Sequence, residues 1–255
     1  MAAWYGDVGY FRPYVSVAKK KALGARELAK LMKKAKRAPE PVVLAGGRRQ
    51  VATTFWGKAW CENLERYADF ANRLPRGRTY VRNGSVLDLA VGRGQVVAYV
   101  AGSELYTVTV AIAPLAKARW KRVVSRCTGR IGSLVGLLRG ELSADVLAVL
   151  CDAKEGLFPE PREISLDCSC PDWAGVCKHV AAVLYGVGSR LDTRPELFFV
   201  LRQVDQTELI SSATSGAVSR RPRKGGAKQL AAGKLADVFG IDIVDEAPTP
   251  RRRTR

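Results

Sequence analysis

The feature that most constrains this chain is a group of three cysteines and one histidine within twelve residues. Cys168, Cys170, Cys177 and His179 follow the pattern C-x-C-x6-C-x-H, and His179 is the single histidine of the 255-residue sequence. Three thiolates and one imidazole make the donor set that a tetrahedral zinc ion takes in structural sites. The pattern therefore predicts one Zn²⁺ ion bound by these four side chains.

The spacing allows the four side chains to meet. In an extended segment, residues two apart point to the same side, so Cys168 and Cys170 can face one metal ion. The six residues that follow are enough for the chain to turn back to Cys177. We expect Cys177 to stand just before a helix, whose positive end favours the thiolate, and His179 to lie in its first turn.

Four protein ligands leave no open position for water, so we expect a structural zinc ion and no catalytic residue. Two other interpretations stay open. One is a buried histidine among structural cysteines, and the other is a catalytic Cys–His pair, against which the two additional cysteines argue. The other three cysteines are expected to be small buried hydrophobic residues: Cys61, Cys127 and Cys151.

The N-terminal sequence favours a protein that stays inside the cell. Asp7 and Arg12 lie in it with no apolar stretch between them, which is not typical of a secretory signal. No apolar run approaches the length that is needed to cross a bilayer. We therefore expect a soluble, cytoplasmic protein without a disulfide framework.

The chain is strongly basic, and its charge is unevenly distributed. Lys and Arg total 42 against 24 Asp and Glu, which gives a net charge of +18. Such an excess attracts polyanions, of which nucleic acid is the commonest. Residues 151–210 are the exception, with six basic and ten acidic residues. The predicted zinc site therefore lies in an acidic stretch of a basic protein.

Apolar periodicity and turn residues predict an α+β fold, with an antiparallel meander sheet flanked by helices. Helices are expected at 25–38, 56–74, 117–126, 131–139, 144–153, 178–185, 195–202 and 227–239. Strands are expected at 79–82, 85–91, 95–101, 106–113 and 163–167. Asn83-Gly84 predicts a type I′ hairpin between the first two strands, since both central residues of that turn need positive φ.

Shifts in composition and charge divide the chain into four parts. Residues 1–50 are a basic N-terminal segment with a helix, and 51–150 are an α+β core with antiparallel strands followed by helices. Residues 151–210 form the zinc finger region. Residues 211–255 are expected to be a basic, flexible linker and tail.

The cysteine and histidine pattern resembles the SWIM zinc finger, whose signature is C-x-C-x(n)-C-x-H. The match is complete at all four positions, and the flanking segments 170–172 and 177–185 resemble bacterial SWIM proteins. Segments 56–60, 76–80 and 156–159 are also similar to that bacterial family. The resemblance implies a small zinc finger that binds DNA or protein, in some cases with a SWI/SNF-type helicase, and it implies no enzymatic activity.

Phosphate contacts are expected from basic side chains outside the acidic stretch. The candidates are Lys19, Lys20, Lys21, Lys33, Lys34, Arg76, Arg78, Arg119, Lys121 and Arg122. We therefore expect a non-enzymatic, zinc-binding nucleic-acid accessory protein, with DNA as its partner, that acts with a DNA-processing machine. One alternative is a protein-interaction subunit of a SWI/SNF-type helicase complex. Another is a nuclease, although no motif groups the carboxylates for metal binding.

Overall fold

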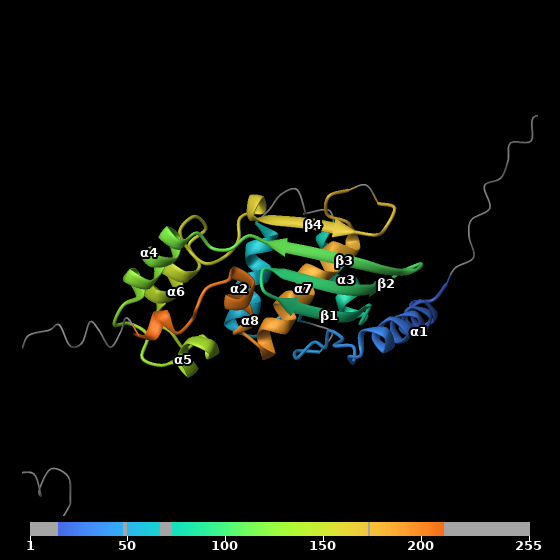
Figure 1. Cartoon of the computed structure of the whole chain (residues 1–255), viewed down its shortest axis with the longest axis horizontal. Coiled ribbons are helices and arrows are strands. Elements are labelled where there is room, and N and C mark those ends of the chain that lie inside the picture. Colours follow the sequence, from blue (N-terminus) through green and yellow to red (C-terminus); the bar gives the residue numbers. More distant parts are fainter. Residues whose placement is uncertain (1–14, 48–49, 67–72, 173, 212–255) are drawn as a thin grey trace, which may run out of the picture. The chain divides into compact units, whose positions relative to one another are not determined.

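The computed structural model describes residues 15–47, 50–66, 73–172 and 174–211 (Figure 1). The helices of this part are α1 (Val17–Ala35), α2 (Phe55–Glu65), α3 (Leu74–Arg82), α4 (Lys117–Cys127), α5 (Leu134–Arg139), α6 (Ala144–Leu150), α7 (Lys178–Thr193) and α8 (Leu197–Arg202). The strands are β1 (Val86–Gly92), β2 (Gln95–Ala101), β3 (Leu105–Ile112) and β4 (Ile164–Cys168), and a 3₁₀ turn, Pro161–Glu163, precedes β4.

The four strands form one antiparallel sheet in the order β1-β2-β3-β4. A short turn joins β1 to β2, and its Gly94 has a φ of 69°, which glycine adopts without steric cost. After β3 the chain passes through α4, α5 and α6 before β4 returns to pair with β3. The predicted α+β fold, with its antiparallel meander, is confirmed.

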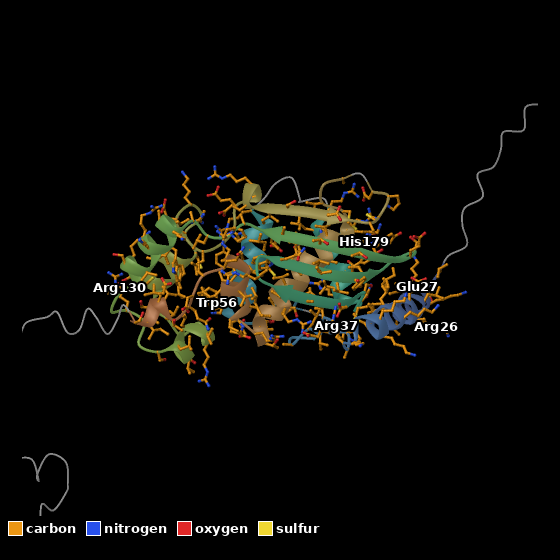
Figure 2. All side chains as sticks on the ribbon, viewed as in Figure 1. Arg26, Glu27, Arg37, Trp56, Arg130 and His179 are labelled. Atoms are coloured by element: carbon orange, nitrogen blue, oxygen red, sulfur yellow. The ribbon has the colours of Figure 1, made fainter. Side chains whose placement is uncertain are left out.

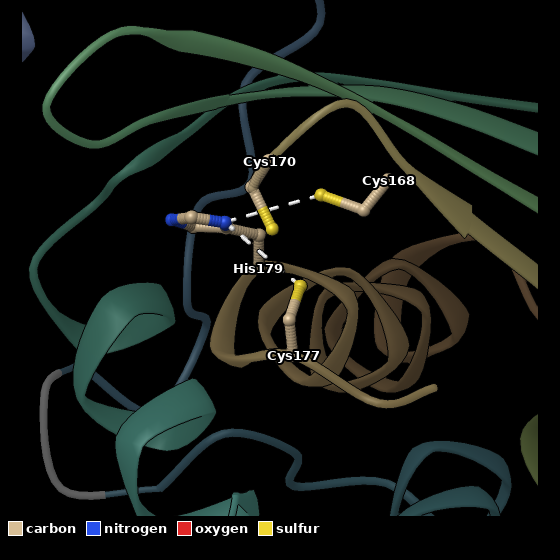
Figure 3. A group of neighbouring side chains, drawn as sticks. All are labelled: Cys168, Cys170, Cys177 and His179. Atoms are coloured by element: carbon tan, nitrogen blue, oxygen red, sulfur yellow. Dashed lines mark hydrogen bonds between the residues drawn. The ribbon is translucent and has the colours of Figure 1, made fainter. Parts of the chain in front are cut away.

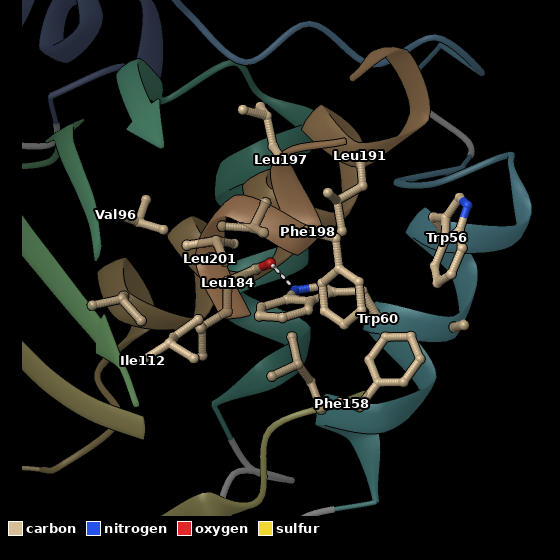
Figure 4. Close-up of a cluster of buried hydrophobic side chains, with 14 of the residues drawn as sticks. Trp56, Trp60, Val96, Ile112, Phe158, Leu184, Leu191, Leu197, Phe198 and Leu201 are labelled. Atoms are coloured by element: carbon tan, nitrogen blue, oxygen red, sulfur yellow. Dashed lines mark hydrogen bonds between the residues drawn. The ribbon is translucent and has the colours of Figure 1, made fainter. Parts of the chain in front are cut away.

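Helix α7 lies at the centre of the packing. It packs against one face of the sheet, and α2 and α3 pack against α7 (Figure 1). Because it is covered on several sides, its sequence is apolar nearly all round. Trp60 donates its indole N–H to the Leu184 carbonyl across 2.8 Å (Figure 4). A Cβ on Gly77 would lie 2.5 Å from the Cβ of Ala181, so α3 approaches α7 this closely only with glycine there.

Helix α1 packs on the end of the sheet where β2 stops. The Ser16 hydroxyl accepts a backbone N–H of its first turn at 3.3 Å. Gly24, Leu28 and Met32 form its buried side. A Cβ on Gly24 would lie 3.1 Å from the Cβ of Ala101, which shows how closely this helix approaches β2.

The structure corrects the prediction for the residues just before the sheet. Thr79–Arg82 is the last part of α3 and not a strand, because Pro75 in the first turn favours a helix start and an alternation of four residues fits a helix equally well. Asn83 and Gly84 link this helix to β1. Gly84 has a φ of 64°, but the φ of Asn83 is −81°, so the predicted type I′ hairpin is wrong.

Two other predicted helices have different bounds. The helix predicted at 56–74 is confirmed only as far as Glu65, where α2 ends, and residues 67–72 of its predicted range lie outside the described residues. The helix predicted at 25–38 begins earlier, at Val17, because Ser16 caps it.

The remaining elements are confirmed with small shifts. Helices α4 to α8 correspond to the five helices predicted between residues 117 and 202, although α7 extends further, to Thr193. The strands predicted at 85–91, 95–101, 106–113 and 163–167 are β1 to β4. The helix predicted at 227–239 and the basic tail lie outside the described residues. Within the described part, no helix has the length and apolar character needed to cross a membrane.

Candidate metal centre

The four predicted zinc ligands come together where the end of β4 meets the start of α7 (Figure 3). Cys168 is the last residue of β4 and pairs with Val108 of β3. Cys170 follows in the turn, Cys177 is the N-cap residue of α7, and His179 lies in the first turn of that helix. The side-chain ligand atoms all lie within 4.8 Å of one another.

The geometry of this cluster fits a zinc ion. His179 Nδ1 lies 3.9 Å from Cys168 Sγ and 3.9 Å from Cys177 Sγ. In a tetrahedral site with Zn–S of about 2.3 Å and Zn–N of about 2.0 Å, sulfur and nitrogen ligands stand about 3.5 Å apart. A small inward movement therefore brings the donors to coordination distance. The chain binds zinc through a Cys₃His set that is closed, as structural zinc sites are.

The cluster favours the thiolate form of Cys177. A hydrogen bond from Cys168, with further bonds from His179 and the Val180 N–H, outweighs burial and lowers the pKa of Cys177 to about 3. The Val180 N–H reaches this sulfur at 3.4 Å because Cys177 caps α7. The shared hydrogen bond and burial raise the pKa of Cys168. Zinc binding must therefore displace a proton from Cys168.

Aromatic side chains enclose the histidine on two sides. The Tyr106 ring stacks on His179 with a centroid distance of 4.3 Å, and the Tyr80 ring meets it edge-on at 5.3 Å. The Tyr106 hydroxyl forms a 2.7 Å hydrogen bond with Ser103, which fixes the stacked ring. His179 Nε2 is buried and has no hydrogen-bond partner among the described residues. These contacts orient Nδ1 toward the thiols.

Gly102 is a further residue of this site that the sequence pattern did not indicate. A Cβ at this position would lie 2.7 Å from Tyr106 Cε2 and 3.1 Å from His179 Nε2. The backbone can pass this close to the histidine only with glycine at this position. No local pattern in the sequence marks Gly102, because its contact with His179 depends on the fold.

We expect Gly102→Ala to weaken zinc binding and to lower the free energy of unfolding by about 1–3 kcal/mol, because the added methyl displaces Tyr106 or His179. Chelator competition gives the zinc affinity, and denaturant titration gives the stability. The matched control is Gly175→Ala in the finger loop, where an added Cβ meets nothing within 4 Å. Equal zinc affinity in the two variants would contradict the proposed role of Gly102.

The loop between Cys170 and Cys177 is anchored by its own polar contacts. The Asp172 carboxylate accepts the Ala174 N–H at 3.2 Å and pairs with Arg73, at the start of α3, at 3.4 Å.

When bound, zinc supplies a cross-link between the end of β4 and the start of α7. Since α7 is the central core helix, the site supports the fold as a whole.

The candidate phosphate contacts on α1 are accessible, with one exception. The exposed or half-exposed residues are Lys19, Lys20, Lys33 and Lys34. Lys21 is half-exposed as well, but it donates its Nζ to the Asn83 carbonyl at 2.9 Å, so it ties α1 to the segment before β1.

The candidates on α3 differ from one another. Arg76 is exposed. Arg78 pairs with Glu65 at 3.7 Å, and its guanidinium carbon lies 5.5 Å from the centre of the Tyr185 ring. Arg78 therefore has protein partners already, and Arg76 is the better candidate of the two.

One of the three candidates on α4 is not accessible to a phosphate. Arg119 is buried, and its Nε donates to the Gly156 carbonyl at 2.8 Å, so it faces the protein interior. Arg122 pairs with Glu155 at 2.7 Å on the surface. Lys121 is exposed. Helices α1 and α4 lie at opposite ends of the sheet, so the candidates do not form one continuous patch (Figure 1).

The fold and the metal centre together define a zinc finger protein of the Cys₃His type. Residues 149–187 match the family model of the SWIM zinc finger. The chain is 35% identical, over 188 residues, to the uncharacterized protein Rv2102 of Mycobacterium tuberculosis, which covers 72% of this chain and 68% of that protein. The chain belongs to this family of SWIM zinc finger proteins. No solved structure matches it.

Proposed function

We propose that this protein is a non-enzymatic accessory protein that binds nucleic acid, DNA in the first place, through the exposed face of α1. The observation that supports this proposal is the charge of that helix. It carries seven basic residues and a single acidic one, Glu27 (Figure 2). Among the described residues, no carboxylate pairs with the exposed or half-exposed cations that α1 offers to a ligand, which are Lys19, Lys20, Arg26, Lys30, Lys33 and Lys34.

The placement of these charges also argues for a ligand. Lys19 and Lys20 lie in the first turn of α1, which has no acidic residue, and Lys21 follows at the start of the second turn. Positive side chains are unfavourable at this end of a helix, by about 0.3–1 kcal/mol each, because the helix dipole is positive there. A bound phosphate backbone would offset this repulsion, because its negative charge attracts both the lysines and the positive end of the helix.

The zinc centre and α1 contact neighbouring residues at the end of β2. Ala101 contacts α1 beside Gly24, and the next residue, Gly102, lies against His179. The metal therefore stabilises the sheet end on which α1 rests. In this proposal zinc has a structural role, and α1 contacts the phosphates. The protein acts in the cytoplasm, where thiolates stay reduced.

Binding led by phosphate contacts predicts a strong dependence on salt. For duplex DNA, the log–log slope of affinity against salt is about −0.9 per phosphate neutralised. We expect the double variant Lys33→Gln, Lys34→Gln to weaken binding and to make the slope less negative by about 1–2. Fluorescence anisotropy with a labelled duplex at several salt concentrations measures both quantities.

The matched control removes two exposed lysines elsewhere, as Lys58→Gln, Lys154→Gln. It has the same net charge as the α1 variant, and both should keep one zinc ion per chain. If the control lowers affinity and slope as much as the α1 variant does, binding depends only on net charge and α1 is not the contact surface. An affinity that does not change with salt would refute phosphate-led binding altogether.

The alternative, a protein-interaction subunit of a SWI/SNF-type helicase complex, is favoured by one observation. Strand β4 is an edge strand of the sheet and ends in the zinc centre, and its Ser165 and Asp167 are exposed. Edge strands can pair with a strand of another protein. In that case the purified protein would bind a duplex weakly, and the α1 variant would not differ from its control.

A further inference from the structure

A pocket at the end of the sheet opposite to α1 lies outside both the zinc centre and the proposed nucleic-acid surface. Its volume is about 600 Å³, within the range of about 300–1,000 Å³ that small-molecule sites occupy. It lies between the β1–β2 turn, the first turn of α4 and the end of α8. Its apolar lining includes Leu115, Trp120 and Phe199, which are buried, and Val200, which is 39% exposed.

Three cations line this pocket, two from α4 and one from the β1–β2 turn. Lys117 and Lys121 are one helical turn apart on α4, and Arg93 is in the β1–β2 turn. Within the described part of the chain, none of the three forms an ion pair with a carboxylate. Cations that line an apolar pocket without carboxylate partners are a ready site for an anion.

The two carboxylates of the lining are already engaged. Asp205 accepts the backbone N–H and the hydroxyl of Thr207 at 2.8 and 2.7 Å, and these bonds lower its pKa. Glu208 accepts the indole N–H of Trp120 at 2.8 Å. Neither carboxylate forms an ion pair with any of the three cations, and cations outnumber carboxylates in the lining by three to two.

The arginine of the pocket is held by the C-cap residue of α8, Gln203. Arg93 Nε donates to Gln203 Oε1 at 3.3 Å, which leaves its two terminal nitrogens available for a bidentate contact. Gln203 has a φ of 57°, in the left-handed region that non-glycine residues rarely adopt. A Cβ on Gly94 would lie 2.4 Å from Gln203 Nε2, so the turn and α8 fit closely together here. The left-handed conformation is common at helix C-caps, and Gln203 is the C-cap residue of α8, so the end of this helix positions the side chain that holds Arg93.

We infer that this pocket binds a small organic anion with an apolar body. Its carboxylate, sulfonate or phosphate group faces Arg93, Lys117 and Lys121, and its apolar part contacts Phe199 and Val200. This inference is independent of the proposed nucleic-acid function, which rests on α1.

The first test uses two fluorescent probes on the full-length, zinc-loaded protein. Anilinonaphthalene sulfonate has an apolar aromatic body and one negative charge, and phenylnaphthylamine has the same body without the charge. We expect the anionic probe to bind with one saturable site per chain and at least about tenfold more tightly than the neutral probe, since one charge-assisted contact is worth about that factor. Equal binding of the two probes would overturn the inference, because it would show a merely apolar site.

The second test changes the pocket itself. Lys117→Glu, Lys121→Glu should weaken the anionic probe by about tenfold or more and leave the neutral probe unaffected. The control Lys33→Glu, Lys34→Glu makes the same charge change on α1 and should leave both probes unaffected. Val200→Trp fills the pocket from an exposed position and should weaken both probes. If the α4 variant binds the anionic probe as tightly as the unaltered protein, or the α1 control weakens it equally, the pocket is not the anion site.

Discussion

Replacing Cys177 with serine is expected to abolish stoichiometric zinc binding and to unfold the region around α7. Serine is itself a good N-cap residue, so the substitution keeps the cap of α7 and removes only a metal-binding thiolate. Zinc binding to finger peptides is worth about 10–16 kcal/mol of apparent free energy, and in such sites much of it is folding free energy. The expected effect therefore exceeds that of any other single substitution discussed for this protein.

Metal analysis of protein purified without chelator measures this prediction. The unaltered protein should contain one zinc ion per chain, and Cys177→Ser should contain none. Cys151→Ser is the control, because Cys151 lies outside the cluster and its thiol is half-buried. A Cys177→Ser protein that keeps its full zinc content would show that this cysteine is not a ligand.

Glu163→Gln is expected to cost about 3–5 kcal/mol of the free energy of unfolding, because it leaves a buried arginine without its counter-charge. Arg202 is only 1% exposed, and its Nη2 contacts the two carboxylate oxygens of Glu163 at 3.1 and 3.2 Å. Arg202 also donates Nη1 to the Ala113 carbonyl at 3.0 Å, at the end of β3. Arg119 adds a second cation at 3.5 Å from Glu163. This network fixes the start of β4, the strand that leads to the zinc ligands.

Denaturant titration of three variants checks this prediction. Glu141→Gln removes the carboxylate of an exposed pair, Arg139–Glu141 at 3.9 Å, and should cost less than about 1 kcal/mol. Adding Arg202→Met to Glu163→Gln removes the orphaned charge, so it should recover part of the lost stability. A Glu163→Gln protein as stable as the Glu141→Gln control would show that the buried pair contributes nothing.

The same carboxylate makes stability depend on pH. Burial by itself would raise the pKa of Glu163, but the Glu160 N–H and Arg202 together lower it below the ordinary value of 4.5. A carboxyl whose pKa is lower in the folded state stabilises the protein above pH 4.5, and this contribution is lost as the pH falls through the folded-state pKa. Glu163→Gln should therefore show a smaller loss of stability on acidification than the unaltered protein.

Several acidic residues of the stretch 151–210, around the zinc finger, form ion pairs within the chain. Glu160 pairs with Arg162 at 2.9 Å, and Glu163 pairs with Arg202. Asp172 pairs with Arg73. These carboxylates therefore neutralise basic residues of the same chain. Neutral replacements at these positions act first on stability, and their effect on nucleic-acid binding has to be measured in protein that still holds zinc.

The sequence by itself determined the features that depend on residues close together in the chain. The zinc ligands lie within twelve residues, so their spacing alone was enough to identify the donor set and the family. The meander was also predictable, because short turns between alternating segments leave few other topologies. Errors arose where the local signal was short, as at Thr79–Arg82, where four residues fit a strand and a helix equally well.

Only the tertiary structure decided which side chains are available to a ligand. Arg119 and Lys121 are two residues apart on a basic helix, yet Arg119 is buried against Gly156 and Lys121 is exposed. The stacking of Tyr106 on His179 likewise joins residues far apart in the sequence. Burial and partners are set by contacts between distant segments, which no local pattern of charge or hydrophobicity contains. For this reason the ligands of the metal could be predicted, but the residues that orient them and the pocket at Arg93 could not.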